Sequence, residues 1–244
     1  MIIGISKYQR NYTEEIKMVE ETNIGKWTEV WDKNYELGYA EKLDDTKAII
    51  TAKEAYDMKL HPYFGVYLFP KWRELKKTDH ALEIGCGDGV IAVRMFTKVG
   101  RFVGIDISNV AIDKITKRFE GIKNVRFEAN TDLLSLKEKF DFIYSITVFQ
   151  HIPKEFTKKY IEQSYQILNK GGAMFFNVVS GIQNENIAEV KFNPNGICEP
   201  SMGFSKEQIE QFCKEAGFEN VQITKMDVQG ANDRYWWYFV LCQK

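Results

Sequence analysis

The chain has 244 residues, and its 33 Lys and Arg residues nearly balance its 34 Asp and Glu residues. Hydrophobic residues make up 44% and charged residues 27%, as in an ordinary globular protein. A chain of this length can bury a core without disulfides or a structural metal. The balanced charge argues against electrostatic binding of nucleic acid over a broad surface, which would need a basic face.

The four cysteines, Cys86, Cys198, Cys213 and Cys242, are far apart, and none forms a CxxC pair. We therefore expect free thiols and no metal site. Residues 1–10 contain no apolar segment of the signal-peptide kind, and no apolar run reaches the roughly 18 residues of a membrane span. These features favour a cytoplasmic protein that does not bind membranes.

Residues 1–78 show helical patterns, and we expect them to form a helical cap on the domain made by residues 79–244. The expected cap helices are Thr13–Glu21, Lys26–Tyr39, Asp45–Tyr56 and Tyr63–Leu75. From His80 onward, short apolar runs alternate with amphipathic stretches. The runs are His80–Ile84, Arg101–Asp106, Val125–Ala129, Phe140–Ile146 and Ala173–Val179, and the amphipathic stretches are Val90–Val99, Asn109–Phe119 and Lys154–Leu168. This alternation predicts a doubly wound α/β fold with a parallel sheet covered on both faces.

The last third of the chain changes character. Residues 180–203 are polar and turn-rich, which is typical of a functional loop. Ser205 and Gln208 have the spacing of a capping box, and Gly217 is a typical helix stop. The strands Val221–Val228 and Tyr235–Gln243 are expected to form an antiparallel hairpin.

The strongest functional signal is the run Leu82-Glu-Ile-Gly-Cys-Gly-Asp-Gly89 at the end of the first strand. Gly85 and Gly87 allow a sharp turn and let a ligand approach the backbone closely. Asp106 ends the next strand about 20 residues later, where a carboxylate can accept both hydroxyls of a ribose. Glu83 can orient the turn or accept from a ligand ammonium. The pattern predicts a ligand that contains a nucleoside.

The position of the third glycine separates two kinds of cofactor. The dinucleotide pattern GxGxxG would place it at Val90, but it falls one residue earlier, at Gly89. Asp88 also puts a carboxylate close to where a pyrophosphate would sit. Both features favour a zwitterionic amino-acid tail over the diphosphate of NAD.

These residues resemble the first two motifs of the class I S-adenosylmethionine-dependent methyltransferases, the second motif being Gly104-Ile-Asp-Ile-Ser108. The resemblance covers roughly residues 78–244. It implies a seven-stranded, mostly parallel sheet whose C-terminal strand is antiparallel, with S-adenosyl-L-methionine as cofactor. It also implies that Gly85, Cys86 and Gly87 contact the methionine part, Asp106 the ribose and Ile107 the adenine.

The resemblance extends to the segments after the third and fourth strands. It implies that Asp132 lies near the adenine amino group and that Leu133 offers its N–H to the ring, although a role for Asp132 as a helix cap or turn residue is nearly as well supported. It also implies that Thr147 borders the methyl donor. His151, in Phe149-Gln-His-Ile152, is either a general base or a histidine that shapes the turn before Pro153.

The acceptor is expected to be a small molecule or a sugar, methylated first of all at a hydroxyl oxygen and otherwise at an amine. Three segments are candidates for binding it: the cap, the loop 180–203 and the hairpin turn. Their candidate residues are Trp31, Tyr35, Tyr63, Asn232, Asp233 and Arg234, against ordinary roles as core aromatics or solvated turn residues. The competing functions are an NAD-binding oxidoreductase and a non-catalytic cofactor-binding protein. Balanced charge disfavours an RNA or protein methyltransferase.

Overall fold

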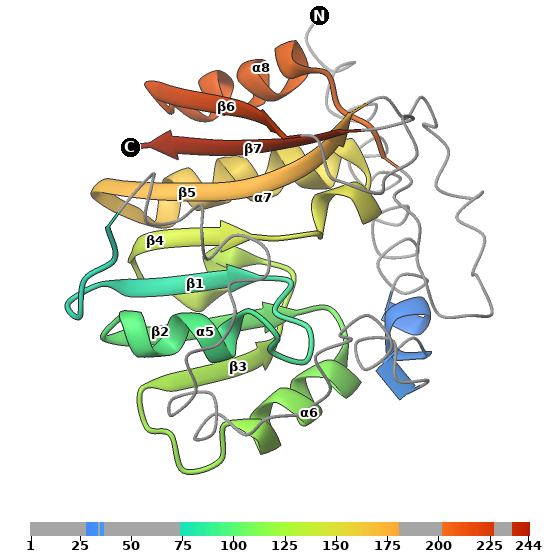
Figure 1. The fold of residues 1–244 in the computed structure, drawn as a ribbon, viewed down its shortest axis with the longest axis vertical. Coiled ribbons are helices and arrows are strands. Elements are labelled where there is room, and N and C mark those ends of the chain that lie inside the picture. Colours follow the sequence, from blue (N-terminus) through green and yellow to red (C-terminus); the bar gives the residue numbers. More distant parts are fainter. Residues whose placement is uncertain (1–27, 34, 37–73, 181–201, 227–235) are drawn as a thin grey trace, which may run out of the picture.

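The computed structural model describes residues 28–33, 35–36, 74–180, 202–226 and 236–244. In this part of the chain, one seven-stranded sheet has the order β3-β2-β1-β4-β5-β7-β6. Helices lie on both of its faces, with α5 and α6 on one side and α7 and α8 on the other (Figure 1). Most of the expected cap, most of the loop 180–203 and the turn 229–234 lie outside the described residues.

The strands follow the expected alternation closely. Their bounds are β1 His80–Ile84, β2 Arg101–Asp106, β3 Val125–Ala129, β4 Phe140–Ser145, β5 Leu168–Ser180, β6 Asn220–Met226 and β7 Trp236–Gln243. The first five strands are parallel, while β7 is antiparallel to both β5 and β6. The expected fold class and the expected C-terminal hairpin are therefore confirmed.

Two elements differ from their expected bounds. The stretch 90–99 forms only the short helix α5 (Ala92–Met95) and a 3₁₀ turn (Phe96–Lys98), because the positive φ of Gly89, 92°, prolongs the turn before it. Strand β5 begins at Leu168 instead of Ala173. Its early part is held by the chain end, since Gly171 N–H donates to Lys244 O and Lys244 N–H donates to Gly172 O.

The remaining helices are α6 (Asn109–Arg118), α7 (Lys154–Ile167) and α8 (Lys206–Ala216), with 3₁₀ turns η2 (Leu133–Leu136) and η3 (Phe149–His151). The capping box is confirmed: Gln208 N–H donates to Ser205 Oγ, and Ser205 N–H donates back to Gln208 Oε1. Gly217 ends α8 with a φ of 107°. Within the described ranges, no helix is both long and apolar enough to cross a membrane.

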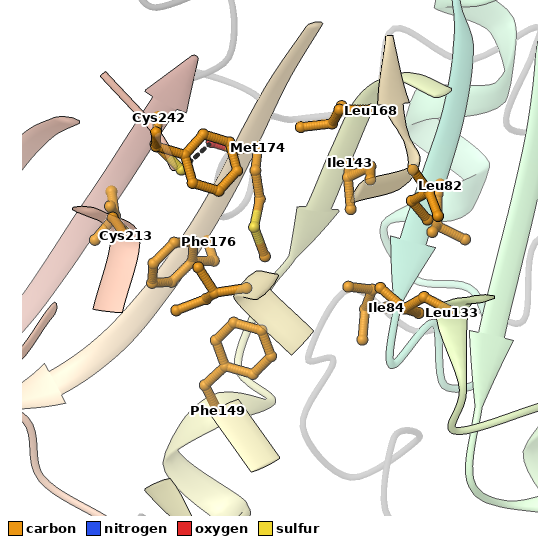
Figure 2. Close-up of a cluster of buried hydrophobic side chains, with 14 of the residues drawn as sticks. Leu82, Ile84, Leu133, Ile143, Phe149, Leu168, Met174, Phe176, Cys213 and Cys242 are labelled. Atoms are coloured by element: carbon orange, nitrogen blue, oxygen red, sulfur yellow. Dashed lines mark hydrogen bonds between the residues drawn. The ribbon is translucent and has the colours of Figure 1, made fainter. Parts of the chain in front are cut away.

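Side chains of the strands are buried on both faces of the sheet, as expected for parallel strands covered by helices. Figure 2 shows the cluster on the α7 and α8 side, where Leu82 and Ile84 of β1 lie near Leu133 and Met174 packs beside Phe176. The three described cysteines, Cys86, Cys213 and Cys242, are free and buried. This core fixes the carboxyl ends of β1, β2, β4 and β5 relative to one another.

The candidate cofactor and acceptor site

The glycine-rich turn is built so that no side chain can replace its glycines. Gly85 and Gly87 have positive φ values of 73° and 53°. A Cβ on Gly85 would lie 2.2 Å from a methyl of Val148, and one on Gly87 would lie 2.5 Å from the hydroxyl of Tyr35. The amides of Gly85 and Cys86 both donate to Ile105 O, which fixes the turn on β2. The structure thus brings the predicted turn together with β2, the loop after β4 and the N-terminal segment.

Asp106 links the two predicted cofactor motifs. It is 7% exposed, and its carboxylate accepts from Gly87 N–H and from Ser108 N–H, each at 2.9 Å. Burial raises the pKa of Asp106 to about 6, although the N–H groups of Ser108 and Gly87 favour the charged form. The main chain of Ile107 also favours the charged form. Since a carboxylate has about four lone-pair positions, it can still accept from a ligand hydroxyl.

Glu83 and Tyr144 form a buried pair beneath the turn. The Tyr144 hydroxyl donates to Glu83 at 2.9 Å. Burial, Asp106 and Asp88 raise the pKa of Glu83, and the Tyr144 hydrogen bond opposes them. Cys86 is also buried, and burial raises the pKa of its thiol. A cationic group placed near Glu83 would favour its charged form.

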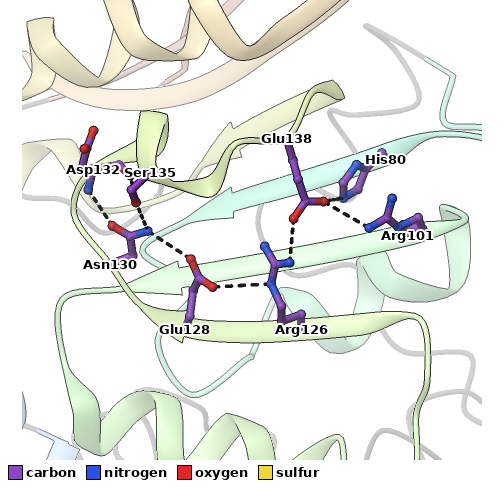
Figure 3. Close-up of polar contacts among 8 residues, drawn as sticks. All are labelled: His80, Arg101, Arg126, Glu128, Asn130, Asp132, Ser135 and Glu138. Atoms are coloured by element: carbon purple, nitrogen blue, oxygen red, sulfur yellow. Dashed lines mark hydrogen bonds and ion pairs between the residues drawn. The ribbon is translucent and has the colours of Figure 1, made fainter.

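The loop after β3 is held by its own polar side chains (Figure 3). Asn130 accepts from Asp132 N–H at 2.8 Å and donates to Glu128 and Ser135. Asp132 caps η2 by accepting from Leu134 N–H at 3.1 Å. Leu133 N–H donates to Gln163 of α7 at 3.1 Å. Asp132 therefore has the capping role that the sequence left open, and the Leu133 N–H is already paired within the protein.

The loop after β4 is strained at Thr147. This β-branched residue has a φ of 58°, which is rare for its type. Its N–H donates to Asn177 Oδ1 of β5 at 2.7 Å, and its hydroxyl donates to Ile146 O. Asn177 is fully buried, and its amide nitrogen has no hydrogen-bond partner among the described residues. Buried polar atoms of this kind require an explanation, such as a ligand or water.

His151 lies at the end of η3 and is 5% exposed. Its Nε2 lies 3.2 Å from the amide nitrogen of Gln150, while its Nδ1 has no partner in the described part of the chain. A carboxamide nitrogen donates and cannot accept, so in this arrangement Nε2 accepts and the ring proton is on Nδ1. Burial lowers the pKa of His151 to about 4, which keeps the ring neutral at physiological pH.

The helical residues 28–33, 35 and 36 contact both the glycine-rich turn and the start of α6. Asp32 accepts from the Ser108 hydroxyl and from Val110 N–H at the start of α6. Trp31 meets His151 edge to face, with ring centroids 5.4 Å apart. The carbonyl of Tyr35 accepts from Lys114 at 2.6 Å. The structure therefore brings Trp31 and Tyr35 to the predicted site, while Tyr63, Asn232, Asp233 and Arg234 lie outside the described residues.

Comparison with known proteins identifies the family. The family model described as "Methyltransferase domain" matches residues 61–223, more than half of the chain. The chain belongs to this methyltransferase family. The resemblance to class I S-adenosylmethionine-dependent methyltransferases is thereby confirmed, and the family match decides against an NAD-binding oxidoreductase.

Relatives of this methyltransferase carry out different transfers. It is 34% identical over 114 residues to a probable cobalt-precorrin-6B C(15)-methyltransferase (decarboxylating) of Saccharolobus solfataricus, covering 43% of this chain and 55% of that protein. It is 23% identical over 162 residues to a ubiquinone biosynthesis O-methyltransferase of Coxiella burnetii, covering 61% and 67%. The chain thus spans about half the length of the first of these relatives.

Solved structures share the fold at low sequence identity. Phosphoethanolamine N-methyltransferase 2 of Haemonchus contortus, in complex with S-adenosyl-L-methionine, matches with a TM-score of 0.59 and 19% identity, covering 73% of this chain and 51% of that one. The cyclopropane synthase MmaA2 of Mycobacterium tuberculosis matches with a TM-score of 0.58 and 15% identity, covering 73% and 82%. These likenesses support the fold and do not identify an acceptor.

Several polar residues of the candidate site were not predicted from the sequence, among them Tyr144, Asp32, Asn177 and Gln163. Asn177 interrupts the apolar run Met174–Val179, and a polar residue inside a buried strand is a signal that could have identified it. Gln163 lies on α7, far from the motifs in sequence, and carried no comparable signal. Its role depends on the packing of α7 against η2.

Proposed function

We propose that this chain transfers the methyl group of S-adenosyl-L-methionine to a small-molecule or sugar acceptor, most readily at a hydroxyl oxygen. One observation carries the proposal. The Asp106 carboxylate accepts from Gly87 N–H with one oxygen and from Ser108 N–H with the other, so one carboxylate joins the glycine turn to the start of α6.

The described residues fit this cofactor by their chemistry. Gly85 and Gly87 hold the turn in its positive-φ conformation, and Glu83 offers a buried carboxylate for the ammonium of an amino-acid tail. Asp106 can accept from the ribose hydroxyls, and half-buried Ile107 can pack on the base. When bound, the cofactor supplies an electrophilic methyl group on a sulfonium sulfur. The residues of this chain then have to orient the acceptor and exclude water.

The acceptor is expected on the β4 and β5 side of the cofactor. Thr147 lies there with a main chain fixed by Asn177. His151 Nδ1 and the amide nitrogen of Asn177, which have no hydrogen-bond partner among the described residues, are polar atoms that can hold an acceptor oxygen. We propose that His151 holds the acceptor by donating from Nδ1, because a ring with a pKa of about 4 is a weak base near pH 7. Holding two reactants in line can supply about 7–11 kcal/mol.

Incubation with methyl-labelled cofactor and a panel of hydroxyl and amine compounds tests the reaction. The proposal predicts labelled product from hydroxyl compounds and a lower rate in His151→Ala. His80→Ala is a matched control, because His80 lies at the opposite end of β1 and contacts Lys139 O and Glu138. Between pH 5 and 8 the ratio of the wild-type rate to the His151→Ala rate should stay constant, because His151 is neutral throughout this range. Binding of NAD with no affinity for S-adenosylhomocysteine would contradict the proposal.

A further inference from the structure

Gln163 of α7 makes a two-point contact with the loop that follows β3. Its side-chain oxygen accepts from Leu133 N–H at 3.1 Å, and its side-chain nitrogen donates to Asp132 Oδ1 at 2.8 Å. Gln163 is 7% exposed and Leu133 is fully buried. A carboxamide that presents an acceptor beside a donor has the same hydrogen-bonding pattern as the ring nitrogen and amino group of adenine.

This contact leaves only part of the expected adenine-binding edge available. The Leu133 N–H is paired, and freeing it would leave the buried Gln163 oxygen without its donor, which costs free energy. Asp132 Oδ1 already accepts from Leu134 N–H and from Gln163. Asp132 is exposed, and its second oxygen takes no hydrogen bond from the described residues. That oxygen remains able to accept from a ligand amino group.

Tyr160 is a second side chain on the face of α7 that carries Gln163. Tyr160 is three residues before Gln163, so the two side chains lie on one side of the helix. Burial raises the pKa of the Tyr160 hydroxyl, and the charges of Asp106 and Asp132 raise it further. The Tyr160 ring is also stacked on Phe149, with centroids 6.1 Å apart. Residues 160 and 163 therefore present one face of α7 to η3 and to the loop after β3.

We propose that Gln163 is a positioning residue for the base of the cofactor. Gln163 holds Asp132 so that its second oxygen accepts from the exocyclic amino group, and it keeps the Leu133 N–H away from the ring nitrogen. The base is then recognised at its amino group and not at ring position 1. This inference rests on the proposed function, because it presumes an adenine-containing cofactor.

Calorimetric titration of the full chain with three ligands tests the inference. The ligands are S-adenosylhomocysteine, its 1-deaza analogue, in which a CH replaces the ring nitrogen, and S-inosylhomocysteine, in which a carbonyl replaces the amino group. The 1-deaza analogue should bind within about threefold of S-adenosylhomocysteine, because a neutral hydrogen bond that is never made costs nothing when its acceptor is removed. S-inosylhomocysteine should bind at least about tenfold more weakly, because its carbonyl meets a carboxylate.

The variant Gln163→Leu should change this pattern by freeing the Leu133 N–H. The 1-deaza analogue should then bind about tenfold more weakly than S-adenosylhomocysteine. Gln166→Leu is the matched control, since Gln166 is an exposed glutamine on the same helix, and it should keep the wild-type ratio. If Gln163→Leu fails to fold, the ratio of the wild-type affinities for S-adenosylhomocysteine and its 1-deaza analogue still tests the inference.

A more than tenfold loss for the 1-deaza analogue with the wild-type chain would overturn the inference and leave the proposed function intact. Absence of S-adenosylhomocysteine binding would overturn the proposed function itself.

Discussion

The two halves of the same sheet edge differ in how completely their polar groups are paired. On the side of β1, β2 and β3, the Asp106 carboxylate and the Asn130 side chain are hydrogen-bonded within the chain, and the loop after β3 is also bonded to Gln163 of α7. On the side of β4 and β5, His151 and Asn177 each keep a buried polar atom without a partner among the described residues. The first half is preorganised for one ligand, whereas the second half depends on groups that the acceptor or distant segments supply.

Removing Asp106 should give the largest effect on the preorganised half. Asp106→Ala removes the acceptor of two main-chain hydrogen bonds and of both expected ribose contacts. Charge-assisted bonds contribute about 1.5–3 kcal/mol each, so affinity for S-adenosylhomocysteine should fall by roughly 100-fold or more. Equilibrium dialysis measures this loss. Asp113→Ala, at an exposed position of α6, should bind like the wild type, and equal affinities of the two variants would remove Asp106 from the site.

Lowering the pH should protonate Asp106 and weaken cofactor binding without any mutation. In the ligand-free chain Asp106 has a pKa of about 6, above its ordinary value of 3.8, so the charged form is disfavoured by folding. The stability that comes from its protonation is full below pH 3.8 and is lost as pH rises through about 6. Cofactor binding needs the charged form, so affinity should fall about tenfold per unit below pH 6. If the affinity of Asp106→Asn depends on pH in the same way as that of the wild type, another group is responsible for the titration.

On the less preorganised half, Asn177→Ala should destabilise the fold. It removes the acceptor of the Thr147 N–H, whose bond measures 2.7 Å, and should lower the free energy of unfolding by about 1–3 kcal/mol. Chemical denaturation measures the change. Asn124→Ala, which removes an exposed side-chain contact of 3.3 Å, should change stability far less. A similar loss in both variants would mean that Asn177 has no special role in holding this loop.

The smallest expected effect is an increase in stability, from a substitution at Thr147. Thr147→Gly places a residue without Cβ at a φ of 58° and should raise the free energy of unfolding by about 1 kcal/mol. Thr147→Ala keeps the Cβ and should show no such gain. Thermal unfolding of the two variants compares them directly. If glycine destabilises the chain, the strain assigned to this loop is absent.

The two halves also differ in how well the sequence predicted them. The glycine turn and Asp106 were predicted because each ends a strand, and residues that end neighbouring parallel strands must lie together. The alternation of strands and helices, the C-terminal hairpin and the α8 capping box followed from periodicity and short motifs, whereas the seven-stranded sheet with its antiparallel C-terminal strand was implied by the family resemblance. The role of Gln163 could not be predicted, because it depends on which residues α7 brings to the loop after β3. Asn177 stood out as a polar residue in a buried strand, but its bond to Thr147 N–H depends on how β5 lies beside the loop after β4. The shortened α5 was missed because the turn at Gly89 overrides local helix propensity.

Amide chemical shifts, followed by NMR during titration with S-adenosylhomocysteine, test the central claim most directly. The account predicts that the largest shifts occur at Gly85, Gly87 and Ser108, whose amides lie in the unit joined by Asp106, and that an equal concentration of NAD leaves them unchanged. Saturable binding whose shifts lie away from these three amides, or shifts of the same size with NAD, would contradict it.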